Sequence, residues 1–344
     1  MIFFFLSVRD PKTDFRRDLV AALRQLGHQV TYIRLARNCF VDGPEPGIER
    51  TCSPLQVAWW MLRSCLSKQR VVVFNTVNLG FPVFCTLLRL LSWRAVWCFD
   101  LHDDLLYDLS GSQRLIARAK LAWHQMISSF SVRAAPTLRE LHPRSRSLCN
   151  ASFVERAPRP TFDWTQILIF SNIDRRFDFE LVEGIVRQNP DFSFHVHGGI
   201  VRDPIIEAAF RRLTQLTNVS YYGTYASSDI ASILERYDVT LAPYRIDRST
   251  RYIDPLRYYH CLNSGLEIVT AAIPRALDMR EWMHIIGSAE EFRPLIAALQ
   301  SGTAKRRNGD EREAITWTDR ATELLDLLGD EQVNNVRLRP ANRT

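Results

Sequence analysis

Apolar residues alternate between two patterns along the chain. The opening stretch 1–8, "MIFFFLSV", is continuously apolar, as a strand buried on both faces is, whereas residues 15–26 repeat apolar positions every three or four residues. Gly27 is expected to end this helix, and a strand pattern returns at 29–35. Further expected elements are a helix at 54–66, a strand at 70–76, a helix from Pro82 and a strand at 94–101. This alternation predicts a parallel sheet covered by helices on both faces.

The alternation stops within 141–164, a stretch rich in Pro, Arg and Ser, and then begins again. Strand patterns at 166–172, 192–199 and 239–244 are separated by helical ones. We therefore predict an α/β protein with two doubly wound, Rossmann-like domains facing a cleft. The expected domains are 1–155 and 156–325, followed by a tail at 326–344. In open parallel sheets, ligands bind outside the carboxyl ends of the strands where the strand order reverses, so each domain would hold one ligand.

The charge of the chain is distributed unevenly. Of its 344 residues, 1–160 carry 22 Lys and Arg against 12 Asp and Glu, whereas the remainder carry 22 against 26. A basic first half suits an anionic membrane, a phosphorylated acceptor or nucleic acid. No basic tract is interleaved with stacking aromatic residues, so nucleic acid is not expected as a partner.

Cysteine usage and hydropathy limit the class of protein. The seven cysteines are scattered and odd in number, without a Cys-x-x-Cys pair, which argues against a disulfide framework or a zinc site and favours a reducing compartment. The opening stretch is expected to be a strand and not a signal peptide. The longest apolar stretch, 79–93, contains Pro82 and Arg89 and is shorter than the roughly 20 residues that span a membrane. We expect a cytoplasmic protein that is soluble or peripheral on the inner face of the cytoplasmic membrane.

An acidic cluster follows the strand expected at 94–101. The stretch "VWCFDLHDDLLYD", 96–108, contains four aspartates and His102. It could be a divalent-metal site, because hard cations prefer oxygen ligands, a general base, or a solvated turn. Neighbouring side chains at a strand end point to opposite faces, so Asp103 and Asp104 compete for one role, whereas Asp100 and Asp108 are expected to be structural.

A second candidate region, 239–274, reads as a strand, an arginine-rich loop, a helix and a strand. Asp254 is expected to be the N-cap of the helix, with Pro255 at its first position and Gly265 at its end. A helix N-terminus suits an anion, and Arg251 and Arg257 could neutralise a diphosphate there. His260, one turn later, could reach ribose hydroxyls. The alternative is that the arginines are solvated.

This region resembles the donor-binding part of glycosyltransferases with the GT-B fold. The family often reads "P-Y/F … N-P-L-K-L-Y-E-Y-L-A-A-G-x-P-V-V", and the chain gives "PY … DPLRYYHCLNSGLEIV". It looks most like the group of the bacterial xanthan-pathway β-glucuronosyltransferase and related family 4-like enzymes. The resemblance implies that the donor is contacted by Tyr244, Leu256, Arg257 and His260. Two positions depart from the family, with Arg257 for the usual lysine and His260 for the usual glutamate.

Two further stretches resemble the same family. The stretch 170–194 is similar to "Y-x-G-x-I-D-x-R-F-D", which implies that Asn172, Arg175 and Arg176 lie near the diphosphate. The alternative is that Asp174 and Asp178 cap a helix and the arginines are solvated. "EAITWTDRATELLDLL", 313–328, matches the closing helix of the family, which is expected to cross back onto the first domain.

The acidic cluster also matches the family. "FDLHDDL", 99–105, is similar to "Y-D-x-x-D-D-F", which implies that Asp103 is the catalytic base of an inverting transfer, with Asp104 as the alternative. A nucleoside diphosphate is a good leaving group, and arginines with a helix N-terminus can stabilise its charge. Neither a metal nor another cofactor is therefore expected.

The resemblance implies a hexosyl- or glycuronosyl-type transferase that uses a nucleotide-sugar, with UDP-sugar favoured. The acceptor would be lipid-linked or a saccharide, in exopolysaccharide or glycolipid synthesis, and a retaining mechanism stays open. Trp, Phe and Leu mixed with Arg or Lys in 55–70 and 80–94 suit either a bilayer interface or internal packing. Alternatives are a catalytically silent homologue that serves a glycan-assembly complex and a metal-dependent nucleotidyl or phosphoryl enzyme.

Overall fold

The computed structural model describes residues 1–9, 14, 16–35, 39–42, 49–155, 162–308 and 313–337, without the side chains of 39–42, 49–50 and 331–337. The chain divides into two compact units. Unit 1 comprises Met1–Asn150 and Thr316–Thr344, and unit 2 comprises Ala151–Ile315. The expected limits differ in two places, because 151–155 belong to unit 2 and 316–325 belong to unit 1 together with the expected tail.

Unit 1 is built on an eight-stranded sheet in the order β4-β3-β2-β1-β5-β6-β7-β8. The strands are β1 (Ile2–Ser7), β2 (Gln29–Arg34), β3 (Cys39–Asp42), β4 (Glu49–Cys52), β5 (Val71–Thr76), β6 (Val96–Leu101), β7 (Phe130–Arg133) and β8 (Arg146–Ser147). The six strands β2, β1, β5, β6, β7 and β8 are parallel to one another, as predicted. The antiparallel hairpin β3-β4 extends the sheet beyond β2 and was not predicted. The strand order reverses between β1 and β5.

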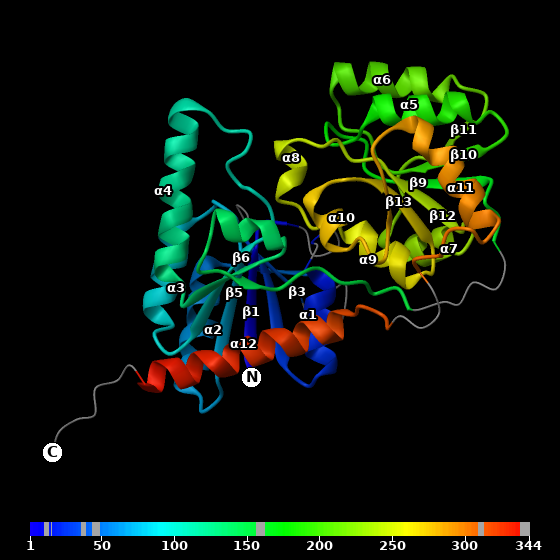
Figure 1. Cartoon of the computed structure of the whole chain (residues 1–344). Helices are drawn as coiled ribbons and strands as arrows, with labels where there is room; N and C mark the ends of the chain where they lie inside the picture. The colour runs from blue at the N-terminus through cyan, green and yellow to red at the C-terminus, as the bar shows by residue number, and fades with distance from the viewer. Residues whose placement is uncertain are drawn as a thin grey trace. The chain divides into compact units, whose positions relative to one another are not determined.

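The helices of unit 1 are α1 (Arg17–Gln25), α2 (Pro54–Leu66), α3 (Pro82–Leu91), α4 (Gly111–Ile127), the short η1 (Pro136–Glu140) and α12 (Trp317–Arg337). Local sequence signals mark two of their ends, the start of α2 and the end of α1. Ser53 and Gln56 form a capping box at the start of α2, and Gly27 ends α1 with φ +81°, as predicted. The predicted return of the closing helix is confirmed: α12 packs on α1 (Figure 1), and Arg70 donates to the carbonyl oxygen of Leu328.

Unit 2 is built on a six-stranded parallel sheet in the order β11-β10-β9-β12-β13-β14. The strands are β9 (Gln166–Phe170), β10 (Ser193–His197), β11 (Val219–Tyr221), β12 (Val239–Ala242), β13 (Glu267–Ala271) and β14 (His284–Ile286). The helices are α5 (Phe179–Gln188), α6 (Pro204–Thr214), η2 (Ser227–Asp229), α7 (Ile230–Leu234), α8 (Arg248–Arg251), α9 (Leu256–Asn263), α10 (Pro274–Asp278), η3 (Ala289–Glu291) and α11 (Phe292–Gln300). The order reverses between β9 and β12, so ligands are expected outside the carboxyl ends of these strands.

Both sheets are buried on two faces. In unit 2 one cluster packs Leu168 and Ile268 against helix α9, and a second packs Ile167 and Val269 against α5 and α11. This explains why the strands read as continuous apolar runs. None of the helices in the described ranges is long and apolar enough to cross a membrane. The cysteines with described side chains are free thiols.

Candidate functional site

The two strands at the reversal point of unit 2 end in loops that bind each other. Tyr244, just after β12, forms a β-bridge with Phe177 of the loop that follows β9. The backbone N–H of Arg245 donates to the carbonyl oxygen of Arg176 over 2.9 Å, and that of Asp178 donates to Pro243 over 2.9 Å. The loop after β9 is therefore fixed against the end of β12. Asp178 also accepts from the backbone N–H of Leu181 and is the N-cap of α5.

A glycine allows the loops after β9 and β10 to approach closely. Gly198 has φ +149°, and a Cβ atom there would lie 1.7 Å from the carbonyl oxygen of Ser171. Its own N–H donates to Gly223 over 2.8 Å. Only glycine fits this position, so the loop after β9 lies directly beside the one after β10.

Three of the residues assigned to the donor gather at this edge. The guanidinium of Arg257 lies 5.0 Å from the ring centroid of Tyr244, within cation–π range. Burial raises the pKa of the Tyr244 hydroxyl, and the positive charges of Arg257 and Arg176 partly oppose this. Arg176 also forms a 3.2 Å ion pair with Asp174. Two cations and a neutral phenol thus share the carboxyl edge of β9 and β12.

The start of α9 differs from the prediction at Asp254. The N-cap is Pro255, and the buried Asp254 carboxylate instead accepts from the hydroxyl of Tyr259 and from Nε of Arg275, each over 2.7 Å. The prediction of Asp254 as the N-cap and Pro255 as the first helical residue is therefore wrong by one position, because the buried Asp254 carboxylate is stabilised by a cation. Gly265, with φ +80°, ends the helix as predicted.

The remaining donor-site candidates lie on the same loops and helices. Asn172 is exposed just after β9, and Leu256 is half-buried at the first position of α9. Arg251 is exposed at the end of α8, with its guanidinium 5.5 Å from the ring centroid of Tyr252. The exposed Arg175 lies in the loop between β9 and α5. These positions are compatible with several roles, so their contact with a donor stays a prediction.

His260 lies in the interior of unit 2. Its side chain is 2% exposed, with Nδ1 2.8 Å from Oγ of Ser152, and its ring centroid lies 4.8 Å from that of Phe153. This histidine connects α9 to the first residues of unit 2. The nearby Glu267 has a structural role, since its buried carboxylate accepts from the backbone N–H groups of Arg307 and Asn308.

In unit 1 the first aspartate of the acidic cluster is part of a buried ion pair. Arg16, whose side chain is fully buried, donates to both Asp100 oxygens, with Nε at 3.0 Å and Nη2 at 2.9 Å. Nη2 also donates to the carbonyl oxygen of Leu148. Arg16 therefore joins β6 to the stretch around Leu148, close to Asn150, where the first segment of unit 1 ends. Sequence reasoning missed Arg16, because it stands in a polar stretch before a helix and its partner is 84 positions away.

The other residues of the cluster differ in exposure. His102 and Asp104 are buried, Asp103 between them is half-buried, and Asp108 is exposed. Oδ1 of Asp104 accepts from the backbone N–H of Leu106 over 3.0 Å, which stabilises the turn after β6. Burial lowers the pKa of His102, although the negative charges of Asp103 and Asp100 oppose this. Asp103 is thus the most accessible carboxylate immediately after this strand.

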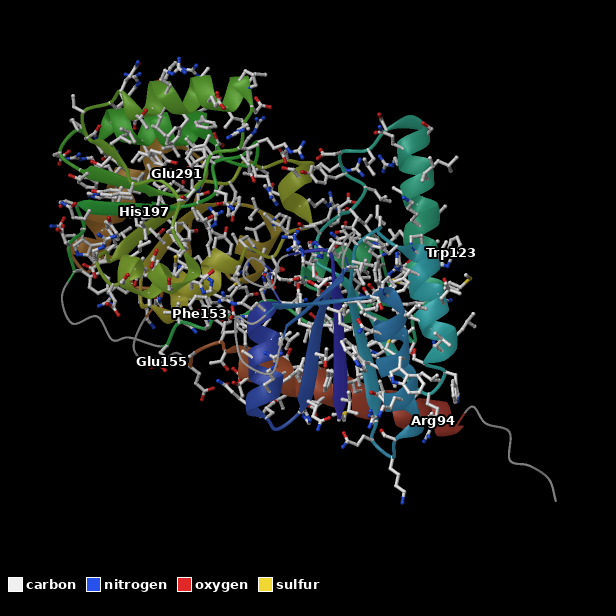
Figure 2. All side chains as sticks on the ribbon, turned by 180° about the vertical axis from the view of Figure 1, so that it is seen from behind. Arg94, Trp123, Phe153, Glu155, His197 and Glu291 are labelled. Atoms are coloured by element: carbon white, nitrogen blue, oxygen red, sulfur yellow. The ribbon has the colours of Figure 1, made fainter. Side chains whose placement is uncertain are left out.

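A histidine and tyrosine cluster in unit 2 was also not predicted. A cavity of about 390 Å³ is lined by His197, Tyr222, Tyr225, Asp229 and Arg236, among others. The rings of His197 and Tyr222 stack, with centroids 4.5 Å apart, and Figure 2 labels His197 on its strand. Burial, followed by the charge of Arg236, lowers the pKa of His197 to about 4. The pattern "HVH" in β10 was the available signal, because alternate residues share one face of a strand.

Within the described ranges, no three His, Cys, Asp or Glu side chains come together as a metal site would require. At the acidic cluster, Asp100 is bound to Arg16 and Asp104 to the backbone of Leu106.

Comparison with known proteins identifies the fold. No family model matches the chain. Over 139 residues it is 22% identical to a Bacillus subtilis protein, TuaH, whose name describes a teichuronic acid biosynthesis glycosyltransferase; the match covers 40% of this chain and 34% of that protein.

Solved structures match over nearly the whole chain. A Rickettsia africae glycosyltransferase has a TM-score of 0.69 at 12% identity, covering 96% of this chain and 98% of its own. Anabaena HepE, solved in complex with UDP, has a TM-score of 0.63 at 12% identity, covering 96% and 100%. Starch synthase IV of Arabidopsis thaliana, solved with ADP and acarbose, has a TM-score of 0.66 at 10% identity, covering 96% and 99%. The chain thus has the GT-B fold of glycosyltransferases, with two Rossmann-like domains.

Proposed function

We propose that this protein is a glycosyltransferase that transfers a sugar from a nucleotide-diphosphate sugar, with UDP-sugar favoured, to a lipid-linked or saccharide acceptor. The observation that carries the proposal is the cluster of Arg176, Tyr244 and Arg257 at the reversal point of the unit 2 sheet. Guanidinium groups bind diphosphates through planar sets of donors. Arg257 lies in the first turn of α9, whose N-cap residue Pro255 makes no side-chain hydrogen bond, and a helix N-terminus suits an anion.

The positive charges suit the leaving group of the reaction. When the glycosidic bond to the diphosphate breaks, the nucleotide gains negative charge, and fixed cations stabilise that charge in the transition state. UDP in HepE and ADP in starch synthase IV, both of the same fold, support a nucleoside diphosphate as the ligand class. The residues proposed for donor binding are Asn172, Arg176, Tyr244, Arg251, Leu256, Arg257 and His260.

We propose Asp103 as the base of an inverting transfer. Its carboxylate would accept the proton of the acceptor hydroxyl while that oxygen attacks the anomeric carbon. Asp103 is favoured over Asp104 because Asp104 is buried and binds the backbone of Leu106. With protein cations at the diphosphate, the reaction needs neither a metal nor another cofactor. Exopolysaccharide or glycolipid synthesis, and a cytoplasmic location, complete the proposal.

Calorimetric titration with UDP, GDP and ADP, and with their sugars, tests the donor part directly. We expect saturable binding of one nucleotide, with affinity reduced in Arg257→Gln. Absence of binding to every one of these nucleotides would reject the proposal. Activity that survives EDTA, measured with the donor that binds, would support metal independence.

A catalytically silent homologue that acts in a glycan-assembly complex is the second candidate. It is favoured by one observation, the position of His260, which is buried and lies against Ser152. Nucleotide binding without hydrolysis or transfer, with all acceptors tested, would favour this candidate over an active enzyme.

A further inference from the structure

The outer faces of α2, α3 and α4 in unit 1 expose an unusual number of large apolar side chains. They are Leu55, Trp59, Trp60 and Leu66 on α2; Val83, Leu87, Leu90 and Leu91 on α3, with Trp93 just after it; and Leu115, Ile116, Trp123 and Met126 on α4. Several are more than half exposed, with Leu90 at 68% and Met126 at 76%. We call this set the α2–α4 face.

These side chains are not part of the core of unit 1. Each helix already buries a different stripe, with Val57 and Met61 from α2, Cys85 and Leu88 from α3, and Leu121 from α4. A helix on the surface of a globular protein normally carries polar residues opposite its buried stripe. The three helices therefore have a second apolar face that the fold itself does not use.

The three helices form one continuous surface. In sequence order, each helix packs beside the next, as Figure 1 also shows. Nε1 of Trp123 donates to Oγ1 of Thr86 over 2.8 Å and thereby joins α4 to α3. A guanidinium N–H of Arg94 donates to the carbonyl oxygen of Cys65 and joins the turn after α3 to α2. Figure 2 labels Trp123 and Arg94 in this part of unit 1.

The charged residues on these three helices are all basic. Residues 51–99 contain no Asp or Glu, and neither does α4. The cations on these helices and the turns after them are Arg63, Lys68, Arg70, Arg89, Arg94, Arg114, Arg118 and Lys120. A partner that complements this face therefore has a broad negatively charged surface, which the cations attract, and an apolar layer below it, which the exposed apolar side chains can enter.

We propose that the α2–α4 face docks unit 1 on an anionic lipid bilayer. Tryptophan is enriched at the boundary between headgroups and acyl chains, where its ring is buried and its N–H stays hydrated. The four tryptophans belong to segments, 51–99 and α4, that also carry leucines and cations but no Asp or Glu, a composition that fits that boundary. Docking deepens the proposed function, because a lipid-linked acceptor would lie in the same bilayer that unit 1 binds. Only this link to the acceptor rests on the proposed function.

Vesicle flotation of the full chain tests the docking without any turnover. We expect binding to vesicles of phosphatidylcholine and phosphatidylglycerol in equal parts, much weaker binding to phosphatidylcholine alone, and a loss of binding at high salt. Brominated lipids should quench tryptophan fluorescence only in the bound state. The double variant Arg63→Glu/Arg118→Glu should bind at least about 30-fold more weakly, because each basic residue at an anionic surface contributes to the affinity.

The apolar part is tested with Trp59→Gln/Leu90→Gln, two exposed positions whose substitution leaves the core intact. The matched control is Ile205→Gln on α6 of unit 2, which is 81% exposed but lies outside the face. We expect weaker vesicle binding for the double variant and unchanged binding for the control.

Equal vesicle binding by the wild type and both double variants would overturn the proposal, as would equal binding to the two vesicle types. So would self-association that the same variants abolish in the absence of vesicle binding, because the face would then join two copies of the chain. Nucleotide titration of the same variants separates the two proposals. Unchanged nucleotide affinity with lost vesicle binding supports docking, whereas vesicle binding without any nucleotide binding would reject only the proposed function.

Discussion

At the end of β6 the chain places three aspartates within five residues, whereas beyond the ends of β9 and β12 it places arginines beside a helix N-terminus. Both groups lie at the carboxyl edge of a parallel sheet, so the backbone geometry is alike and the charge is opposite. In each, one charge is compensated internally, Asp100 by Arg16 and Arg176 by Asp174. This difference matches the division of labour in the proposed function, in which unit 1 supplies a carboxylate for proton transfer and unit 2 supplies cations for the diphosphate.

The largest expected effect concerns the buried ion pair between Arg16 and Asp100 in unit 1. Arg16→Met leaves the fully buried Asp100 carboxylate without its cation, which should lower the free energy of unfolding of unit 1 by about 3–5 kcal/mol. Urea unfolding followed by tryptophan fluorescence measures this. In Glu183→Gln, which removes an exposed pair with Arg187 on α5, the change should stay below about 0.5 kcal/mol. Equal effects of the two variants would contradict a structural role for the Arg16–Asp100 pair.

The next effect concerns the cations of unit 2. Arg257→Gln removes the guanidinium that lies over Tyr244, and the affinity for the nucleotide should fall by roughly 10- to 100-fold, as expected for hydrogen bonds to a charged group. Arg257→Lys keeps the charge but loses the planar donors, so its affinity should lie between those of the wild type and Arg257→Gln. Calorimetry with the nucleotide that binds gives both values.

Arg187→Gln, on the outer side of α5, serves as the control for loss of positive charge in unit 2. If it weakens nucleotide binding as much as Arg257→Gln does, the effect is one of net charge and the arginine cluster is not the binding site.

Most of the fold of both units could be predicted from the sequence, because local patterns of apolar residues determine the helices and strands. Continuous apolar runs such as 71–74 and 3.6-residue periodicity such as that of α1 identify the elements of both sheets, because burial on two faces leaves little choice of residue. The order of α/β elements likewise indicated a double Rossmann-like architecture. The hairpin β3-β4 was missed because its short strands, "CFVD" and "ERTC", lack a clear alternation.

The candidate site was less predictable, because its contacts join distant positions. Nothing near Asp254 indicated Arg275, and nothing near Asp100 indicated Arg16. Local capping rules therefore assigned Asp254 to the helix N-terminus, although a cation in the folded protein binds it instead. The exposure pattern of the acidic cluster, by contrast, follows the alternation expected from the strand that precedes it.

The smallest expected effect concerns the pH dependence of the free energy of unfolding of unit 2. Burial lowers the pKa of His197 in the folded protein from its ordinary value of 6.5 to about 4, so between these pH values the unfolded chain binds a proton that the folded chain does not. The stabilising effect of the neutral ring is complete above pH 6.5 and is lost as the pH falls from 6.5 towards 4. In His197→Gln, the free energy of unfolding of unit 2 should fall less steeply over this window. An unchanged slope in urea titrations at several pH values would contradict the assignment.

The division of labour itself is tested most directly by measuring nucleotide affinity and turnover on the same variant. For Asp103→Asn the account predicts an unchanged dissociation constant for the donor nucleotide and a turnover number reduced by about 10²- to 10⁴-fold, with a smaller loss of turnover in Asp104→Asn. Full turnover in Asp103→Asn, or a loss that follows weakened nucleotide binding, would contradict the assignment of the base to unit 1.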